Sequence, residues 1–203
     1  MNFNTAYSEN FYFFTNKLTE ENKKSIIKFK NISIIYENNE TSINNEELIR
    51  IIKFCKEKKI KIYCKDDIKK AYKLNFNGIF LSSINKKVSI LNSSYNNKIN
   101  FKIIGGAHNQ WEYFLKKRQG CKDIFFSSLF KNLKYSQNKI LKICKFNLMA
   151  NEWKCNLFAL GGINSTNLKK VFMTKSKGIG FISFINDLEI KKPVYFFQNR
   201  RAL

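Results

Sequence analysis

The chain has 203 residues, of which 44% are hydrophobic, and its 37 lysine and arginine residues against 15 aspartate and glutamate residues give a formal net charge of +22. The apolar content excludes an intrinsically disordered chain, and no run of about 18 uncharged apolar residues suits a membrane-spanning helix. The charge invites a nucleic-acid partner, but only four basic residues are arginine and the lysines are dispersed, so we expect none.

Short apolar runs recur along the chain and predict eight β-strands. In chain order they cover residues 11–14, 32–36, 60–64, 78–82, 101–105, 123–127, 157–161 and 178–184. Most of these runs are apolar at nearly every position. Such runs are typical of parallel strands that are buried on both faces.

Helical periodicity appears between several of these strands. It predicts helices over 46–58, after 109, over 139–149 and after 164. Their capping residues would be Asn44 with Glu47, Asn109 with Glu112, and Asn164. Their apolar positions are Leu48, Ile51, Ile52 and Cys55, then Trp111, Phe114 and Leu115, then Leu141, Cys144 and Leu148, and finally Leu168, Val171 and Phe172.

This alternation of strands and helices favours parallel pairing through right-handed crossovers. Eight units in about 200 residues predict a compact (β/α)8 TIM barrel, a single domain over residues 1–203. A doubly wound open sheet is the alternative, but no G-x-G-x-x-G motif follows the first strand. The polar segment 84–100 predicts a short or irregular crossover.

The cysteines and the start of the chain indicate the compartment. Five cysteines occur without a C-x-x-C pair, and the first residues lack the basic and apolar stretches of a secretion signal. We therefore expect a cytoplasmic protein that does not bind membranes and whose cysteines are reduced and mostly in the core. With a single histidine in the chain, a zinc site is not expected.

The active site of a TIM barrel lies at the carboxyl ends of its strands. Gly161 and Gly162 end the predicted seventh strand before a capped helix, in a region where phosphate groups commonly bind to backbone N–H groups. The alternative explanation for these glycines is a tight turn with positive φ.

Two more strand ends carry candidate groups. His108 follows the fifth strand and is either a structural residue or a proton shuttle. Asp66 follows the third strand beside Lys65 and is a candidate magnesium ligand, helix cap or half of an ion pair.

Taken in order, several segments of the chain resemble the thiamine-phosphate synthase/TenI superfamily of small barrels, over residues 33–185. The most specific are Ala159-Leu160-Gly161-Gly162-Ile163-Asn164 and Gly178-Ile179-Gly180-Phe181-Ile182-Ser183-Phe184-Ile185. Supporting segments are Ile104-Gly105-Gly106-Ala107-His108-Asn109 with Glu112, residues 120–130, Lys65-Asp66 with Ala71, and Gly78-Ile79-Phe80-Leu81.

The resemblance implies a thiamine-pathway enzyme acting on small phosphorylated substrates. The synthase of this superfamily joins hydroxymethylpyrimidine diphosphate to thiazole phosphate and releases pyrophosphate with the help of Mg²⁺. By resemblance, the thiazole phosphate would lie against Gly161, Gly162, Ile182 and Ser183. The tautomerase branch, TenI, uses a histidine after strand five as acid and base, and His108 matches it.

The side that would bind the diphosphate departs from the family's pattern. The family's Arg-x-Lys after strand two is Tyr36-Glu37-Asn38 here, and its Asn-Asp after strand three is Lys65-Asp66. The second magnesium carboxylate falls on Asn85, so Asp66 and Asn85 would form a weakened Mg²⁺ site. The remaining candidates for the diphosphate and pyrimidine side are Tyr36, Asn38, Lys65, Lys131, Asn132 and Lys134.

Three functions remain open at this point. The first, and the leading prediction, is a divergent thiamine-phosphate synthase, in which lysines steady the leaving pyrophosphate. The second is a TenI-like tautomerase that uses His108 without a metal. The third is a barrel that binds a phosphorylated ligand without catalysis.

Overall fold

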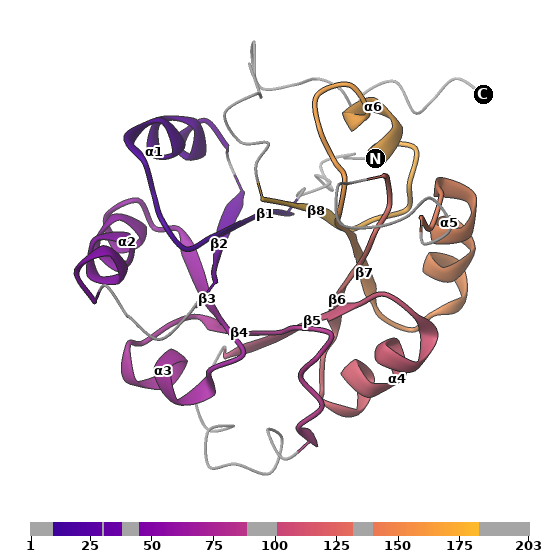
Figure 1. Cartoon of the computed structure of the whole chain (residues 1–203), viewed down its shortest axis with the longest axis horizontal. Helices are drawn as coiled ribbons and strands as arrows, with labels where there is room; N and C mark the ends of the chain where they lie inside the picture. Colours follow the sequence, from indigo (N-terminus) through magenta and orange to yellow (C-terminus); the bar gives the residue numbers. More distant parts are fainter. Residues whose placement is uncertain (1–9, 30, 38–44, 89–100, 132–139, 183–203) are drawn as a thin grey trace, which may run out of the picture.

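The structure, a computed structural model of the whole chain, describes residues 10–29, 31–37, 45–88, 101–131 and 140–182. Eight parallel strands form one closed barrel in the order of the sequence, and helices surround it (Figure 1). The predicted (β/α)8 barrel is confirmed, and the open-sheet alternative is wrong. Among the described residues, no helix has the length and apolar character needed to cross a membrane.

All eight predicted strands are present. Their bounds are β1 Asn10–Thr15, β2 Ile32–Tyr36, β3 Lys61–Lys65, β4 Gly78–Leu81, β5 Lys102–Ala107, β6 Asp123–Phe126, β7 Asn156–Ala159 and β8 Gly178–Phe181. The barrel closes between β1 and β8, where Phe11 pairs with Ile179. The carboxyl ends of all eight strands therefore lie at one end of the barrel.

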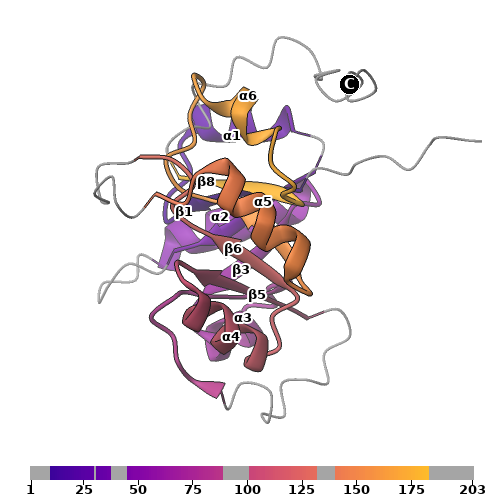
Figure 2. The ribbon, with the colours of Figure 1, turned by 90° about the vertical axis from the view of Figure 1, so that its right-hand side faces the viewer.

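Six helices are described. They are α1 Glu20–Ile27, α2 Asn45–Glu57, α3 Ile68–Lys73, α4 Gln110–Arg118, α5 Ile143–Glu152 and α6 Leu168–Val171. The side view in Figure 2 shows α1 and α6 on one side of the strands and α3 and α4 on the opposite side. The described residues between β4 and β5 contain no α-helix, and residues 89–100 of the predicted short or irregular crossover lie outside the described residues.

The inner faces predicted for two helices are wrong. In α4 the exposed side chains include Trp111, 86% exposed, and Phe114, whereas Tyr113 and Lys116 are buried. In α5 the predicted Cys144 and Leu148 are exposed, and the buried residues are Phe146 and Met149. Apolar residues on the exposed outer face of each helix misled the periodicity argument.

The barrel interior is filled mainly by aromatic rings. The inward-facing cluster consists of Tyr12, Phe14, Ile35, Tyr63, Phe80, Ile104, Phe125 and Phe158, with Leu160 packed against it. The rings of Phe14 and Phe80 meet edge to face with centroids 5.1 Å apart, a favourable geometry for aromatic pairs. Glycines on β5 and β8 make room for these rings, because a Cβ at Gly106 would lie 2.8 Å from Phe80.

Gly180→Ala is expected to lower the free energy of unfolding by about 1–3 kcal/mol, because a Cβ there overpacks the interior. It would approach atoms of Phe125, Leu160 and Phe14 to between 2.8 and 2.9 Å. Urea unfolding measures the loss. The double variant Gly180→Ala with Leu160→Ala should lose less than the sum of the two single variants, and strict additivity would contradict the packing argument.

Polar side chains at the amino ends of the strands are paired with one another. Asp123, 4% exposed, forms an ion pair with Lys102 and accepts a hydrogen bond of 2.8 Å from the Asn156 side chain. Lys102 also contacts the Tyr12 hydroxyl at 3.3 Å. Burial, with the Asp123 charge, raises the pKa of Tyr12. Because these groups are paired with one another, we assign them a role in stability. The active site is expected at the opposite end of the barrel.

Three of the five cysteines are core residues, as predicted, whereas Cys144 is exposed and Cys155 is half-buried. Burial raises the thiol pKa of Cys55, Cys64 and Cys121 from 9.0 to about 12.

This predicts alkaline destabilisation. Above about pH 9 the unfolded chain releases thiol protons that the folded chain retains, so stability falls toward pH 12. Each thiol contributes a slope of up to about 1.4 kcal/mol per pH unit. Urea unfolding between about pH 8 and pH 11 measures it, and Cys121→Ala should make the slope shallower. A flat profile would contradict the prediction.

Candidate active site

The residues that follow the inward-facing positions of each strand converge at the carboxyl end of the barrel, here called the mouth. Side chains alternate between the two faces of a strand, so a residue two positions after an inward ring also faces inward. Ile35 and Tyr63 are inward, so Glu37 and Lys65 follow on the mouth side. By the same rule Ser82, two residues after the inward-facing Phe80, lies at the mouth.

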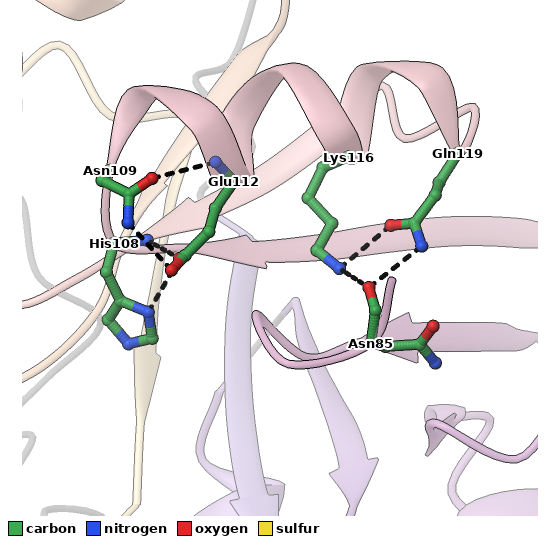
Figure 3. Close-up of polar contacts among 6 residues, drawn as sticks. All are labelled: Asn85, His108, Asn109, Glu112, Lys116 and Gln119. Carbon is green, nitrogen blue, oxygen red and sulfur yellow. Dashed lines mark hydrogen bonds and ion pairs between the residues drawn. The ribbon is translucent and has the colours of Figure 1, made fainter. Parts of the chain in front are cut away.

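His108 belongs to this set because Gly106, two residues earlier, faces the Phe80 ring inside the barrel. Its imidazole Nδ1 lies 3.0 Å from Glu112 Oε2, and its backbone N–H donates to the same oxygen at 2.6 Å (Figure 3). With the proton on Nδ1 directed to the carboxylate, Nε2 is the nitrogen that points away from Glu112. The pair is half-exposed.

The Glu112 side chain that contacts His108 is itself held in place at the N-terminus of α4. The Asn109 side chain accepts a hydrogen bond of 3.0 Å from the Glu112 N–H, and its Nδ2 donates to Glu112 Oε1 at 2.9 Å. The predicted N-cap at Asn109 is therefore confirmed, whereas the Glu112 side chain accepts from the His108 N–H and from the Asn109 side chain. The pairing of Glu112 with His108 was not predicted, although their i, i+4 spacing was the signal for it.

Asp66 and Asn85, the candidate magnesium ligands, lie in contact. Asp66 Oδ1 accepts hydrogen bonds of 2.9 Å from the Ser82 N–H and 3.0 Å from Asn85 Nδ2. The Asn85 amide oxygen accepts from the Lys87 N–H, so Asn85 presents its NH₂ group to Asp66. This arrangement does not fit a cation between the two side chains. Among the described residues, no three His, Cys, Asp or Glu side chains gather as metal ligands.

Lys65 is paired with Glu37, the residue between the two positions that are basic in the family's Arg-x-Lys. Its Nζ lies 2.7 Å from Glu37 Oε1, and the two side chains are 29% and 19% exposed. Tyr36 faces the opposite way and is buried in the outer core between strands and helices, so its side chain does not reach the mouth. Burial is the main cause that raises the Tyr36 pKa.

For the other residues predicted to bind the diphosphate and the pyrimidine, the structure describes only Lys131. Lys131 is exposed in the loop after β6. Asn38, Asn132 and Lys134 lie outside the described residues.

Gly161 and Gly162 form a turn with φ of +91° and +70°. A Cβ at Gly162 would lie 2.5 Å from the Phe130 carbonyl oxygen, because the loop after β6 approaches closely. The Gly161 carbonyl accepts from the Phe130 N–H and the Gly162 carbonyl from Asn167 Nδ2. The N–H groups of both glycines make no hydrogen bond to any other described residue.

The neighbours of this turn differ from the prediction in one respect. Asn164 does not cap α6 directly: its side chain accepts from the N–H groups of Thr166 and Asn167 and so shapes the turn, and α6 begins only at Leu168. Ile182 lies half-exposed after β8, and Ser183 lies outside the described residues.

Lys116 is a buried cation that the sequence did not reveal. Its side chain is 0% exposed, and Nζ donates to the Asn85 carbonyl at 2.8 Å and to Gln119 Oε1 at 2.9 Å (Figure 3). Gln119 donates in turn to the Asn85 and Lys87 carbonyls. Burial lowers the Lys116 pKa. The two side chains anchor the irregular segment after β4 to α4.

Comparison with known proteins finds a family model and several solved structures that match the chain. The family described as "Thiamine monophosphate synthase" matches residues 24–185. The thiamine phosphate pyrophosphorylase from Pyrococcus furiosus superposes with a TM-score of 0.69 at 17% identity, over 87% of each chain. No curated protein matches the sequence.

Two further solved structures are similar at the level of the fold. The thiamine phosphate pyrophosphorylase from Bacteroides thetaiotaomicron has a TM-score of 0.55 at 17% identity, covering 94% of this chain and 89% of that one. The citrate synthase SbnG has a TM-score of 0.59 at 11% identity, covering 87% and 86%. At such identities the likeness concerns the barrel alone.

Proposed function

Because the chain belongs to the thiamine monophosphate synthase family, we propose that it is a thiamine-pathway enzyme that anchors a thiazole monophosphate at Gly161 and Gly162 and isomerises it with His108. The observation that carries the proposal is the His108–Glu112 pair. It directs one imidazole nitrogen to a carboxylate, an orientation that suits a histidine acting as acid and base.

In the proposed isomerisation, His108 acts twice, first as a base and then as an acid. Nε2 of His108 removes a proton from a carbon atom of the substrate, and the electron pair moves within the conjugated system. The same nitrogen then returns the proton to another atom of the substrate, so atoms and charge balance. Glu112 stabilises the imidazolium that exists between the two transfers and keeps the ring in one orientation.

The substrate would be held in position by its phosphate. Two adjacent glycines with positive φ direct their carbonyls into the protein, and their N–H groups have no partner among the described residues. Backbone N–H groups in such turns bind anions well. Holding the substrate by a group that does not react leaves its ring beside the acid–base residue.

The synthase reaction is the second candidate, favoured by the family's description. It would use Asp66 for Mg²⁺ and Lys65 for the leaving pyrophosphate. In the described residues, Asn85 turns an NH₂ group toward Asp66, and Lys65 already has an anionic partner. Both observations count against the binding of a diphosphate, so the isomerase reaction is preferred.

The two reactions are separated by one set of assays on the full chain. A thiazole phosphate tautomer is incubated in D₂O and followed by NMR, and we expect enzyme-dependent isomerisation with exchange of a carbon-bound hydrogen, unaffected by a chelator. Thiazole phosphate with hydroxymethylpyrimidine diphosphate is incubated with and without Mg²⁺. Formation of thiamine phosphate would overturn the isomerase proposal in favour of the synthase. Ligand binding without turnover of either kind would leave a non-catalytic binding protein.

A further inference from the structure

The side of the mouth formed by β2 and β3 has a charge opposite to that of the whole chain. The chain carries 37 basic and 15 acidic residues. At the ends of these two strands, within residues 36–37 and 65–67, the order is reversed: Glu37, Asp66 and Asp67 are acidic, and Lys65 is the one base. The excess of lysine over the whole surface would concentrate anions at the mouth. The local excess of acidic residues has the opposite effect, so it bears on which anionic ligands can bind there.

The geometry shows how the single base is neutralised. Glu37 Oε1 and Lys65 Nζ are 2.7 Å apart, and both side chains are more than two-thirds buried. Solvent screens such a pair less than an exposed pair. The backbone holds both ends, since the Glu37 N–H donates to the Thr15 carbonyl and Lys65 pairs with Phe80 across β3 and β4. Lys65 is thus held by a carboxylate rather than presented to an incoming anion.

The neighbouring carboxylates of Asp66 and Asp67 add further negative charge to this side of the mouth. Asp66 faces Asn85 and the Ser82 N–H with one oxygen, and Asp67 accepts from the Lys70 N–H at the start of α3. A phosphoryl group placed here would meet the charges of Glu37 and Asp66 with no uncompensated cation among residues 36–37 and 65–67. Repulsion between like charges is a direct way to reject one ligand in favour of another.

We infer that Glu37 is a specificity-determining residue, which makes the β2–β3 side of the mouth reject a second phosphoryl group and accept substrates whose far end is neutral or cationic. The inference deepens the proposed function by naming the residue that excludes substrates with a diphosphate arm. It rests on that proposal only in taking the mouth as the place where substrate binds.

Binding of inorganic pyrophosphate tests the inference without any need for turnover. Isothermal titration at about 150 mM salt should show at least tenfold tighter binding to Glu37→Gln than to the wild type, because the repulsive charge is gone and Lys65 is released. The double variant Glu37→Gln with Lys65→Met should lose the gain. Glu57→Gln is the matched control: it makes the same change of net charge at the last residue of α2, at the other end of the barrel.

Three results would overturn the inference. They are wild-type affinity equal to that of Glu37→Gln, an equal gain in Glu57→Gln, and a gain that survives the loss of Lys65. Glu37→Ser serves as a second variant if Glu37→Gln unfolds, which thermal denaturation reveals. Full isomerase turnover by His108→Gln would refute the proposed function and leave these binding results unchanged, so the two failures are distinguishable.

Discussion

Replacing His108 with glutamine is expected to reduce isomerase turnover by about 10²–10⁴-fold, the range that general acid–base catalysis contributes. Glutamine keeps a donor for Glu112 Oε2 but has no nitrogen that gains and returns a proton at neutral pH. Affinity for the thiazole monophosphate should stay within about twofold, because the proposed phosphate anchor lies in the turn after β7, whereas His108 follows β5. Steady-state kinetics and calorimetry measure the two quantities.

Glu112→Gln is the companion variant. Glutamine at this position preserves the capping of α4, since an amide also serves in a capping box. It removes the negative charge that stabilises the imidazolium, so we expect a turnover loss of at least tenfold with little change in stability. Full activity in His108→Gln would refute the acid–base role, whatever Glu112→Gln does.

Gly162→Ala is expected to weaken binding of the thiazole monophosphate by about 10–100-fold, the loss that accompanies one hydrogen bond to a charged group. Its φ of +70° disfavours any side chain, and the new Cβ would lie 2.5 Å from the Phe130 carbonyl oxygen and 2.6 Å from that of Lys131. The turn must therefore move, and its N–H groups move with it. Calorimetry with the monophosphate measures the effect.

The control for this variant is Gly120→Ala. Gly120 also has a positive φ, +80°, but lies between α4 and β6, away from the mouth. It should lose stability through the same backbone strain. Its affinity for the monophosphate should not change. Equal affinity losses in both variants would mean that the effect at Gly162 is general destabilisation, and the phosphate anchor would be refuted.

Strand positions were predictable because β2, β4 and β6 are apolar at nearly every position. A strand that is buried on both faces leaves that pattern in any short window of the sequence. The helices α1 and α3 were missed for the opposite reason: they are short and polar. Each has only one buried residue, Ile26 in α1 and Ala71 in α3. Packing on the barrel and a side-chain cap, not periodicity, account for them.

The sequence predicted which residues lie at the mouth, because they follow the strands, but it did not predict which of them contact one another. Closure of a parallel barrel brings all carboxyl ends together, so His108, Lys65 and Gly161 were candidates from order alone. The partners of Lys65 and of Asn85 depend on the orientation of side chains across neighbouring strands. The sequence showed that the family's two basic residues are replaced by Tyr36 and Asn38, but only the distance of 2.7 Å revealed that Glu37 between them pairs with Lys65.

The sequence by itself determined that this chain is a (β/α)8 barrel with glycines and a histidine at its strand ends, because strand burial and glycine placement are local properties of the chain. Only the tertiary structure decided which of those side chains meet. It paired Glu37 with Lys65, turned Tyr36 outward and buried Lys116 against the Asn85 carbonyl. The physical reason is that an ion pair or a buried cation depends on distances of a few ångströms between segments remote in sequence, which the folding of the whole barrel sets.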